Sequence, residues 1–325
     1  MKKILVTGGM GFIGSHFIRN VLNTHPDWFV VNLDKLTYAG NPKNLTDLDG
    51  HSRYEFVQGD ICDDALIARI ASRVGMIVNF AAETHVDRSI DAAEDFIETN
   101  VQGTRVLLDA ARRFGHELFL HVSTDEVYGS IQEGSFSETS PLVPNSPYAA
   151  SKAASDLMVL AYVKTYGIPA IITRACNNYG PYQFPEKVVP LFVTNLSEKK
   201  KVPLYGNGQN VREWIHVEDH CRALDLLIGS GVRGQIYNVG SREEISNNDL
   251  TKKILKFFGL GENWIERVQD RLGHDFRYSL NTSKIQKLGF VPKWNFEDGL
   301  KQTIDWYLRN EWWWQPLKKD AYTLK

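Results

Sequence analysis

The sequence is poor in the features that mark secreted, membrane-spanning and nucleic-acid-binding proteins. Only three of its 325 residues are cysteine, and Cys62, Cys176 and Cys221 show no pairing pattern, which argues against a disulfide framework and favours a reducing cytoplasm. Its longest apolar runs are the length of a strand, far below the ~20 residues that a membrane span requires. The formal net charge of −2 gives no reason to expect a nucleic acid or an anionic membrane as partner.

The composition is otherwise that of an ordinary globular enzyme. Hydrophobic residues make up 43% of the chain and charged residues 23%, and there is no internal repeat or low-complexity linker. A chain of 325 residues exceeds a comfortable single hydrophobic core, so two lobes are expected. Met1-Lys2-Lys3 leads directly into a strand and a glycine-rich loop, so we expect no signal peptide.

Strand-like and helix-like segments alternate through the first half, which predicts an α/β fold with a doubly wound, Rossmann-like parallel sheet. The expected strands span residues 3–7, 28–33, 54–57, 76–80, 118–122 and 168–175, and the expected helices span residues 15–22, 63–73, 91–114 and 148–166. The alternation lapses near residue 178. We therefore predict a Rossmann domain over 1–178 and a smaller mixed α/β lobe over 179–325, with a strand near 235–240 rejoining the main sheet.

A glycine-rich loop, Gly8-Gly9-Met10-Gly11-Phe12-Ile13-Gly14, lies between the first strand and the first helix. Glycine lets the backbone pass close to a pyrophosphate, and the N-terminus of the helix offers free amide hydrogens to it. The glycines at 9, 11 and 14, or equally 8, 11 and 14, match the fingerprint Gly-x-Gly-x-x-Gly in the strand-to-helix context that it requires. The loop therefore predicts a dinucleotide cofactor.

The second strand ends in Asp34, 20 residues after Gly14. A carboxylate there can accept hydrogen bonds from the adenosine ribose and would repel a 2′-phosphate, so NAD is favoured over NADP, although Lys35 weakens that preference slightly. A tight turn with a capping aspartate is the alternative. Asp60-Ile61 ends the next strand at a position suited to the adenine edge, and the small Ala81-Ala82 allows a flat cofactor to lie across the sheet edge.

The polar stretch Ser123-Thr124-Asp125-Glu126 follows the apolar strand 118–122. Open α/β sheets bind their ligands at the carboxyl ends of strands, so a hydroxyl and two adjacent carboxyl groups predict a catalytic site here. The alternative is a polar strand end followed by a turn at Gly129. Adjacent strand residues point to opposite faces, so Asp125 and Glu126 can serve one site only if the strand has already turned at Asp125.

Tyr148 and Lys152 lie four residues apart on one face of the helix that Ser146 and Pro147 begin. A phenol has a pKa near ~10, so making it a base near neutral pH takes about 4 kcal/mol of preferential stabilisation of the phenolate. A neighbouring ammonium and the positive nicotinamide of NAD⁺ both act in that direction. An interface tyrosine beside a solvated lysine is the alternative, and Thr124, placed to bind the same substrate hydroxyl, weighs against it.

Gly8 to Gly14, Asp34, Thr124, Tyr148 and Lys152 resemble the extended short-chain dehydrogenase/reductase superfamily. The runs Ala81-Ala82-Glu83-Thr84-His85-Val86-Asp87-Arg88-Ser89 and Ser123-Thr124-Asp125-Glu126-Val127-Tyr128-Gly129 narrow the resemblance to the dTDP-glucose 4,6-dehydratase family. The likeness covers essentially the whole chain, and the Thr-Asp-Glu run is its most specific element.

The resemblance implies three groups of site residues, and we expect no metal site. The catalytic group is Thr124, Asp125, Glu126, Tyr148 and Lys152. The NAD-binding group is Gly8, Gly11, Phe12, Ile13, Gly14, Asp34, Lys35, Thr37, Asp60, Ile61, Ala81, Ala82, Thr99, Tyr148, Lys152 and Asn178. The substrate-binding group is Thr84, His85, Thr124, Asn177, Lys187, Val188, Pro203, Tyr205, Arg212, Asn247, Arg271 and His274. Leu272 departs from the proline usual in this family.

The implied reaction converts dTDP-glucose to dTDP-4-dehydro-6-deoxyglucose and water, a step toward deoxysugars such as rhamnose. Tyr148, assisted by Lys152 and Thr124, would remove the hydroxyl proton at sugar carbon 4 while a hydride passes to NAD⁺. Glu126 would then remove the hydrogen at carbon 5, and Asp125 would protonate the hydroxyl leaving carbon 6. The hydride returns to carbon 6. Two crowded acids can divide these roles because like charges raise one pKa.

Two other functions stay open at this stage. A nucleotide-sugar 4-epimerase would use the same tyrosine, lysine and NAD but would not need Asp125 and Glu126. A non-catalytic NAD-binding regulator is less consistent with an intact Thr124, Tyr148 and Lys152.

Three further patterns have a less direct connection to the reaction. His216 and His220 could share a zinc ion, but no third ligand suggests itself. Trp306 and the run 312–314 are expected to pack the last helix onto the body, with a sugar-stacking platform as the alternative. The helix 148–166 is apolar on more than one side, which, with the helix at 101–111, suggests a homodimer through a four-helix contact. The family resemblance points the same way.

Overall fold

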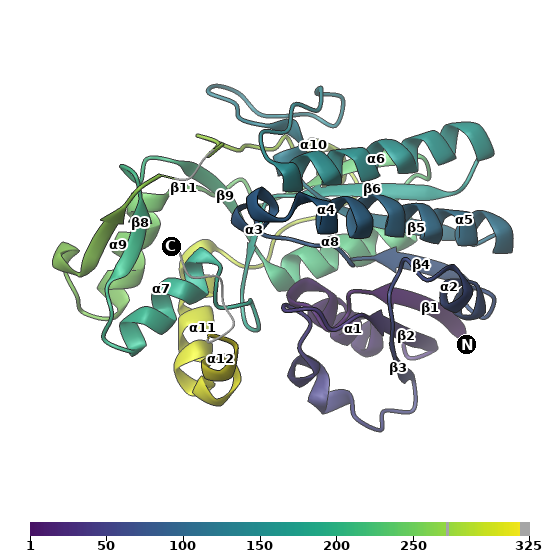
Figure 1. Cartoon of the computed structure of the whole chain (residues 1–325), viewed down its shortest axis with the longest axis horizontal. Helices are drawn as coiled ribbons and strands as arrows, with labels where there is room; N and C mark the ends of the chain where they lie inside the picture. The colour runs from purple at the N-terminus through teal and green to yellow at the C-terminus, as the bar shows by residue number, and fades with distance from the viewer. Residues whose placement is uncertain (271–272, 319–325) are drawn as a thin grey trace.

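The computed structural model describes residues 1–270 and 273–318. At its centre is a seven-stranded parallel sheet in the order β10-β6-β5-β4-β1-β2-β3 (Figure 1). The strands are β1 (Lys2–Thr7), β2 (Trp28–Asp34), β3 (Tyr54–Gln58), β4 (Met76–Asn79), β5 (Leu118–Thr124), β6 (Ala170–Ala175) and β10 (Gln235–Val239). The strand order switches direction between β1 and β4, the point at which such sheets bind ligands.

Helices cover both faces of this sheet because side chains alternate along each strand. In β1, Ile4 and Val6 join one buried cluster and Leu5 joins the other. The first face is covered by α1 (Phe12–Thr24), α8 (Val217–Ser230) and α10 (Ser283–Gln286). The second face is covered by α2 (Asp64–Ala71), α5 (Thr104–Phe114) and α6 (Pro147–Tyr166). The doubly wound α/β sheet predicted from the sequence is confirmed.

A second lobe lies beside the carboxyl ends of the strands (Figure 1). Its sheets contain β7 (Asn177–Tyr179), β9 (Val211–His216) and β11 (Glu244–Ser246) in one, and β8 (Val202–Tyr205) and β12 (Ile265–Val268) in the other. Its helices are α7 (Val188–Ser197), α9 (Asn247–Phe257), α11 (Phe296–Arg309) and α12 (Glu311–Lys318). Trp214, Trp313 and Trp314 are in its core and Trp306 packs against it. The packing expected of Trp306 and the run 312–314 is therefore confirmed except at Trp312, which is 53% exposed.

The chain crosses between the lobes more often than the sequence suggests. The segment 235–240, which we expected to rejoin the main sheet, contains β10, and β10 pairs with β6. In addition, α8 and α10 pack on the main sheet although they follow residue 178. Three elements that follow residue 178 therefore belong to the layers of the first sheet, so the two lobes are not contiguous in sequence. The division into domains at residue 178 stays a prediction.

The long helix expected over 91–114 is confirmed over 93–114, but it contains a π-helical segment and a separate short helix precedes it. The helical region starts earlier, with α3 (Val86–Asp91), and breaks at Ala92 before α4 (Ala93–Phe96) and the π-helical η2 (Ile97–Gly103). Asn100, within η2, donates to the Ser151 hydroxyl at 2.8 Å and exchanges two hydrogen bonds with the Glu83 backbone. These contacts fix Asn100 toward the sheet edge, and π-helical turns are common at such functional positions.

Two helix starts follow local sequence signals. Helix α1 begins at Phe12, three residues before our expectation, because Gly11 already occupies its N-cap. Asp63 caps α2 by accepting from the N–H groups of Ala65 and Leu66, a role that aspartate often has at this position. The short helices are η1 (Pro42–Leu48), η3 (Asp125–Tyr128) and η4 (Glu262–Trp264). Across residues 1–270 and 273–318, no helix combines the length and apolar character that crossing a membrane requires.

Candidate active site

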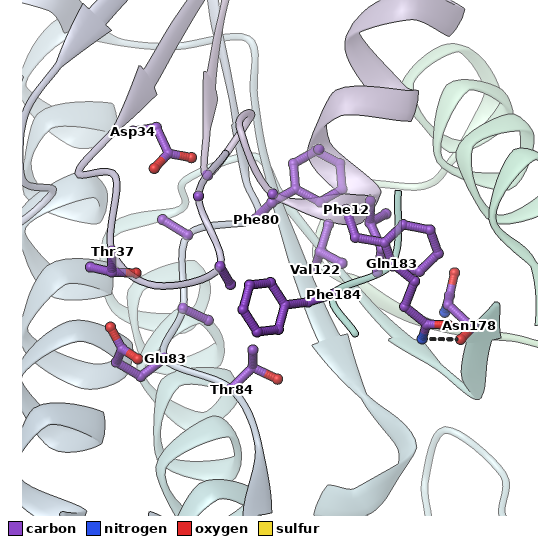
Figure 2. Close-up of a pocket in the computed structure, with 18 of the residues that line it drawn as sticks. Phe12, Asp34, Thr37, Phe80, Glu83, Thr84, Val122, Asn178, Gln183 and Phe184 are labelled. Atoms are coloured by element: carbon purple, nitrogen blue, oxygen red, sulfur yellow. Dashed lines mark hydrogen bonds between the residues drawn. The ribbon is translucent and has the colours of Figure 1, made fainter. Parts of the chain in front are cut away.

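A cavity of about 320 Å³ opens at the carboxyl ends of β1, β2, β4, β5 and β6. We call it the first cavity. Every residue that the sequence analysis assigned to NAD lines it, as do the five predicted catalytic residues. Figure 2 shows Asp34, Thr37, Glu83 and Thr84 around it, with the Phe184 ring between them and Gln183. The structure therefore brings together residues that are as far apart in sequence as Gly8 and Asn178.

The glycine loop is shaped to cradle a dinucleotide. Gly8 has a φ of +69°, and a Cβ on Gly14 would lie 2.4 Å from the Gly8 carbonyl oxygen, so larger residues would break the turn. No side chain caps the N-terminus of α1, which leaves its first N–H groups for a pyrophosphate. These features fit the NAD that the sequence predicts.

Asp34 is held where a ribose would bind. Its carboxylate accepts from the N–H of Met10 at 2.9 Å and from the N–H of Leu36 at 2.8 Å, and burial raises its pKa. Lys35, which could have favoured a 2′-phosphate, instead pairs with Asp60 at 2.6 Å. That ion pair weakens the argument for NADP, because it engages the ammonium elsewhere.

Strand β5 has ended before Asp125, which is the condition for Asp125 and Glu126 to serve one site. It ends at Thr124, and η3 begins at Asp125. The Thr124 hydroxyl caps η3 by accepting from the Glu126 N–H at 3.2 Å, and it lies 3.3 Å from an Asp125 carboxyl oxygen. Both Asp125 and Glu126 consequently line the first cavity.

Burial differs between these two acids. Asp125 is 2% exposed, and its Oδ2 has no hydrogen-bond partner. Burial, followed by the charges of Glu126 and Glu213, raises the pKa of Asp125 well above its usual value, which favours the protonated form of this acid. Glu126 is half-buried. The environment thus suits Asp125 to donate a proton and leaves Glu126 as the base of the pair.

Tyr148 and Lys152 project from the first turns of α6. Ser146 caps this helix by accepting from the Ala149 N–H at 3.1 Å, and Pro147 is its first residue. The Lys152 ammonium donates to the Val122 carbonyl at 2.9 Å, and burial lowers the pKa of Lys152 to about 8. Both side chains line the first cavity.

The surroundings of Tyr148 in the protein do not by themselves favour the phenolate, and the lowering of its pKa by Lys152 and NAD⁺ stays a prediction. Burial raises the pKa of Tyr148, and the charge of Glu126 raises it further, whereas hydrogen bonds with Thr84 and Thr124 lower it. Proton abstraction by this phenol calls for positive charge nearby, which Lys152 and the nicotinamide of NAD⁺ are predicted to supply.

A second cavity of about 190 Å³ adjoins the first. It contains most of the residues predicted to bind substrate: His85, Asn177, Lys187, Val188, Pro203, Tyr205, Arg212, Asn247 and His274. Thr84 and Thr124 line the first cavity instead, and Arg271 and Leu272 lie outside the described residues. Glu126 and Tyr148 line both cavities, so the reacting groups lie at their junction.

Arg212 is built into the floor of the second cavity. It is 5% exposed, its guanidinium lies 4.3 Å from the centre of the Tyr278 ring, and it donates to the Asp275 carbonyl at 2.8 Å. Its role in binding the substrate stays a prediction. The imidazole of His274 lies 2.6 Å from the Asp270 carboxylate.

Sequence reasoning missed a group of residues that lines the cavities between β7 and α7. Gln183 donates to the Asn178 carbonyl at 2.8 Å (Figure 2), and Glu186 pairs with Arg88 at 3.0 Å. Arg88 lies 3.8 Å from the centre of the Tyr38 ring. The signal was present, because Gln183 and Glu186 closely follow a strand end, but neither matches a phosphate or proton-transfer motif.

The two histidines considered for zinc bind separate partners. His216 lies 3.2 Å from Gln302, and His220 lies 2.9 Å from the Asn178 side chain. Within the described part of the chain, no three side chains of suitable type converge on a metal position. Each imidazole is instead part of a local hydrogen-bonded contact.

A family model described as GDP-mannose 4,6 dehydratase matches residues 5–303 of the chain. A dTDP-glucose 4,6-dehydratase from Streptomyces niveus is 52% identical over 321 residues, which cover 97% of this chain and 96% of the relative. These matches span both lobes and both cavities.

Solved structures give the same comparison in three dimensions. DesIV, a dTDP-glucose 4,6-dehydratase from Streptomyces venezuelae solved with NAD bound, has a TM-score of 0.95 at 54% identity, covering 97% of this chain and 99% of that one. A UDP-glucuronic acid 4-epimerase from Bacillus cereus, solved with UDP-glucuronic acid and NAD, has a TM-score of 0.90 at 26% identity, covering 94% and 99%. Dehydratases and epimerases thus share this fold. Of these two solved structures, the dehydratase is the more similar to this chain in sequence.

Proposed function

From the premise that the chain belongs to the nucleotide-sugar 4,6-dehydratase family, we propose that it converts dTDP-glucose to dTDP-4-dehydro-6-deoxyglucose and water, with NAD as its cofactor. The turn at Asp125 carries this proposal. It lets a buried acid and a half-buried acid line one cavity beside Tyr148, which an elimination needs and a simple epimerisation does not.

The residues divide the proton transfers among them. Tyr148 accepts the hydroxyl proton at sugar carbon 4, oriented by Thr124, while the Lys152 ammonium supports the negative charge on that side of the cavity. Glu126 takes the hydrogen at carbon 5, which the new ketone has acidified, and Asp125 gives its proton to the hydroxyl that leaves carbon 6 as water. Bound NAD supplies the redox chemistry, in which the hydride removed from carbon 4 is returned to carbon 6. Carbon 5 is reprotonated at the end.

Incubation with dTDP-, UDP-, GDP- and CDP-glucose tests both the reaction and the nucleotide. We expect dTDP-glucose alone to be converted efficiently, giving a 4-keto-6-deoxy product that has lost one water, identified by mass spectrometry and NMR. A product of unchanged mass that keeps its 6-hydroxyl would indicate a 4-epimerase. No turnover of any sugar would favour a non-catalytic regulator.

The active form that we propose is a homodimer. Ile97 and Leu157 are 60% and 56% exposed and lie on η2 and α6, which pack together on one face of the sheet. Two copies of α6 and of the continuous helix formed by η2 and α5, facing one another, would bury these side chains in a four-helix contact. Leu157→Glu should shift the protein to the monomer in light scattering after gel filtration, whereas Val291→Glu, at an exposed site elsewhere, should not.

We also place the chain in the cytoplasm. Its three cysteines are all free thiols, and Cys176 and Cys221 are buried, a state that a reducing compartment maintains. Detection of the protein in a cytoplasmic rather than a periplasmic or secreted fraction would test this location.

A further inference from the structure

Helix α12, near the C-terminal end of the chain, reaches the loop that binds the dinucleotide. Its residue Trp313 is 1% exposed and lines the first cavity together with Asn41 and Asn44. The Trp313 indole N–H donates to the Asn44 side-chain oxygen at 2.9 Å. This contact joins positions 269 residues apart in the sequence.

From Asn44 the hydrogen bonds continue to the glycine loop and the ribose site. The Asn44 side-chain N–H donates to the Met10 carbonyl at 2.8 Å, and that carbonyl also accepts from the Asn41 N–H at 3.0 Å. The Met10 N–H donates to Asp34 at 2.9 Å. Trp313 thus supports, through Asn44, both the turn of the glycine loop and the carboxylate predicted to bind ribose.

The Trp313 ring is itself fixed by the second lobe. Its centre lies 5.2 Å from the ring of Trp306 and 5.6 Å from the ring of Tyr182, which also lines the first cavity. Aromatic pairs at these separations resist displacement. The ring is therefore held in place by the second lobe, while its indole N–H holds Asn44 beside the dinucleotide loop.

We propose that Trp313 is a positioning residue that fastens the second lobe to the dinucleotide loop and slows the exchange of bound NAD. The reaction proposed above returns its hydride within each cycle, so turnover does not require the cofactor to leave. The inference rests on NAD as the cofactor and is independent of the sugar nucleotide. Because turnover does not require the cofactor to leave, slow exchange of NAD is compatible with full activity.

Trp314 provides a matched control one residue away. It is equally buried, at 1% exposure, and its indole N–H also makes one hydrogen bond, to the Tyr307 carbonyl at 2.9 Å. Tyr307 belongs to α11 of the same lobe, and Trp314 does not line the first cavity. The two tryptophans thus differ in what they connect rather than in burial.

The test compares Trp313→Phe with Trp314→Phe in NAD-loaded protein. The protein is mixed with excess isotopically labelled NAD, and the unlabelled NAD that remains bound is followed by mass spectrometry. Losing one hydrogen bond should speed NAD release by about tenfold in Trp313→Phe, while Trp314→Phe stays within about twofold of the parent.

A second variant separates the loop contact from packing of the ring. Asn44→Asp keeps an acceptor for Trp313 but removes the N–H that holds the Met10 carbonyl, so it should also speed release. Equal release rates for the parent and Trp313→Phe, or equal acceleration by Trp314→Phe, would overturn the proposal. The assay contains no sugar nucleotide, so it does not depend on the proposed substrate, and parent protein that retains no NAD would overturn the cofactor assignment and this inference together.

Discussion

The two cavities meet at Tyr148 and Glu126 but are constructed in different ways. The first is formed mainly by the short segments that follow successive parallel strands of one sheet. The second collects residues from β8, β9, the start of α9 and the segment at His274, which are joined by no common sheet edge. The first cavity is therefore set by local motifs and one topology, and the second by contacts between distant segments.

This difference predicts which substitutions affect one cavity alone. A change at a strand end of the main sheet should alter cofactor binding or the chemistry of the junction. A change on β9 or α9 should alter nucleotide-sugar binding and leave NAD in place. Residues at the junction should affect catalysis without releasing either ligand.

The largest effect is expected at the junction, from Asp125→Asn combined with Glu126→Gln. Removing the acid and the base of the elimination should lower dehydration by at least about 1,000-fold. Oxidation at carbon 4, in which Tyr148 accepts the proton and NAD⁺ the hydride, should survive, so reduced cofactor should accumulate in a single turnover. The absorbance of the reduced cofactor provides the measurement. Glu133→Gln, at an exposed acid of the same region, is the control and should behave as the parent. Full dehydration by the double variant would remove both acids from the mechanism.

A smaller and more selective effect is expected from Asp34→Asn. This variant keeps the size of the side chain but removes the charge that binds ribose hydroxyls and repels a 2′-phosphate, so NAD affinity should fall by about tenfold. The preference for NAD over NADP should fall as well. Titration with each dinucleotide measures both changes. An equal loss of dTDP affinity would show that the two cavities are not separable.

Arg212→Lys, in the second cavity, should have the opposite selectivity: it should weaken dTDP binding and leave NAD binding unchanged. A lysine keeps the positive charge but cannot form two parallel hydrogen bonds with phosphate oxygens, so affinity for dTDP should fall by about fivefold. Calorimetric titration of NAD-loaded protein with dTDP provides the measurement, and the NAD content should match that of the parent. Unchanged dTDP affinity would exclude Arg212 as a diphosphate ligand.

The same contrast explains what the sequence could predict. The glycine loop, Asp34 and the Tyr148–Lys152 pair each have spacing set by a strand or helix, so their placement follows from local periodicity. The π-helical turn around Asn100 was missed because it depends on hydrogen bonds to Glu83 and Ser151. The pairing of Glu186 with Arg88 joins residues 98 positions apart, and no local pattern encodes such a contact.

The pKa of Tyr148 shows a further limit of reasoning from spacing. Four residues separate it from Lys152, and that spacing correctly puts both side chains on one cavity. It does not determine their electrostatics, because burial and the nearby Glu126 raise the pKa of Tyr148. The balance between a helpful ammonium and an unhelpful carboxylate depends on the turn at Asp125, which is a three-dimensional feature.

The smallest expected effect concerns stability and sharpens the distinction between the two acids. The pKa of Asp125 is raised in the folded protein, mainly by burial. The folded state therefore holds this proton more tightly than the unfolded state. The stability that it contributes is complete below the unfolded pKa, near ~3.9, and is lost as pH rises through the folded pKa.

Asp125→Asn resembles the protonated acid and has no proton to lose, so it should unfold at a higher temperature than the parent at neutral pH, by at least about 2 °C. The difference should shrink toward zero as pH approaches ~4, measured by thermal unfolding of the NAD-loaded protein at several pH values. Glu133→Gln should leave the unfolding temperature unchanged throughout, because Glu133 is exposed. A parent protein as stable as Asp125→Asn at neutral pH would mean that Asp125 is already ionised there. It could not then be the group that protonates the leaving hydroxyl.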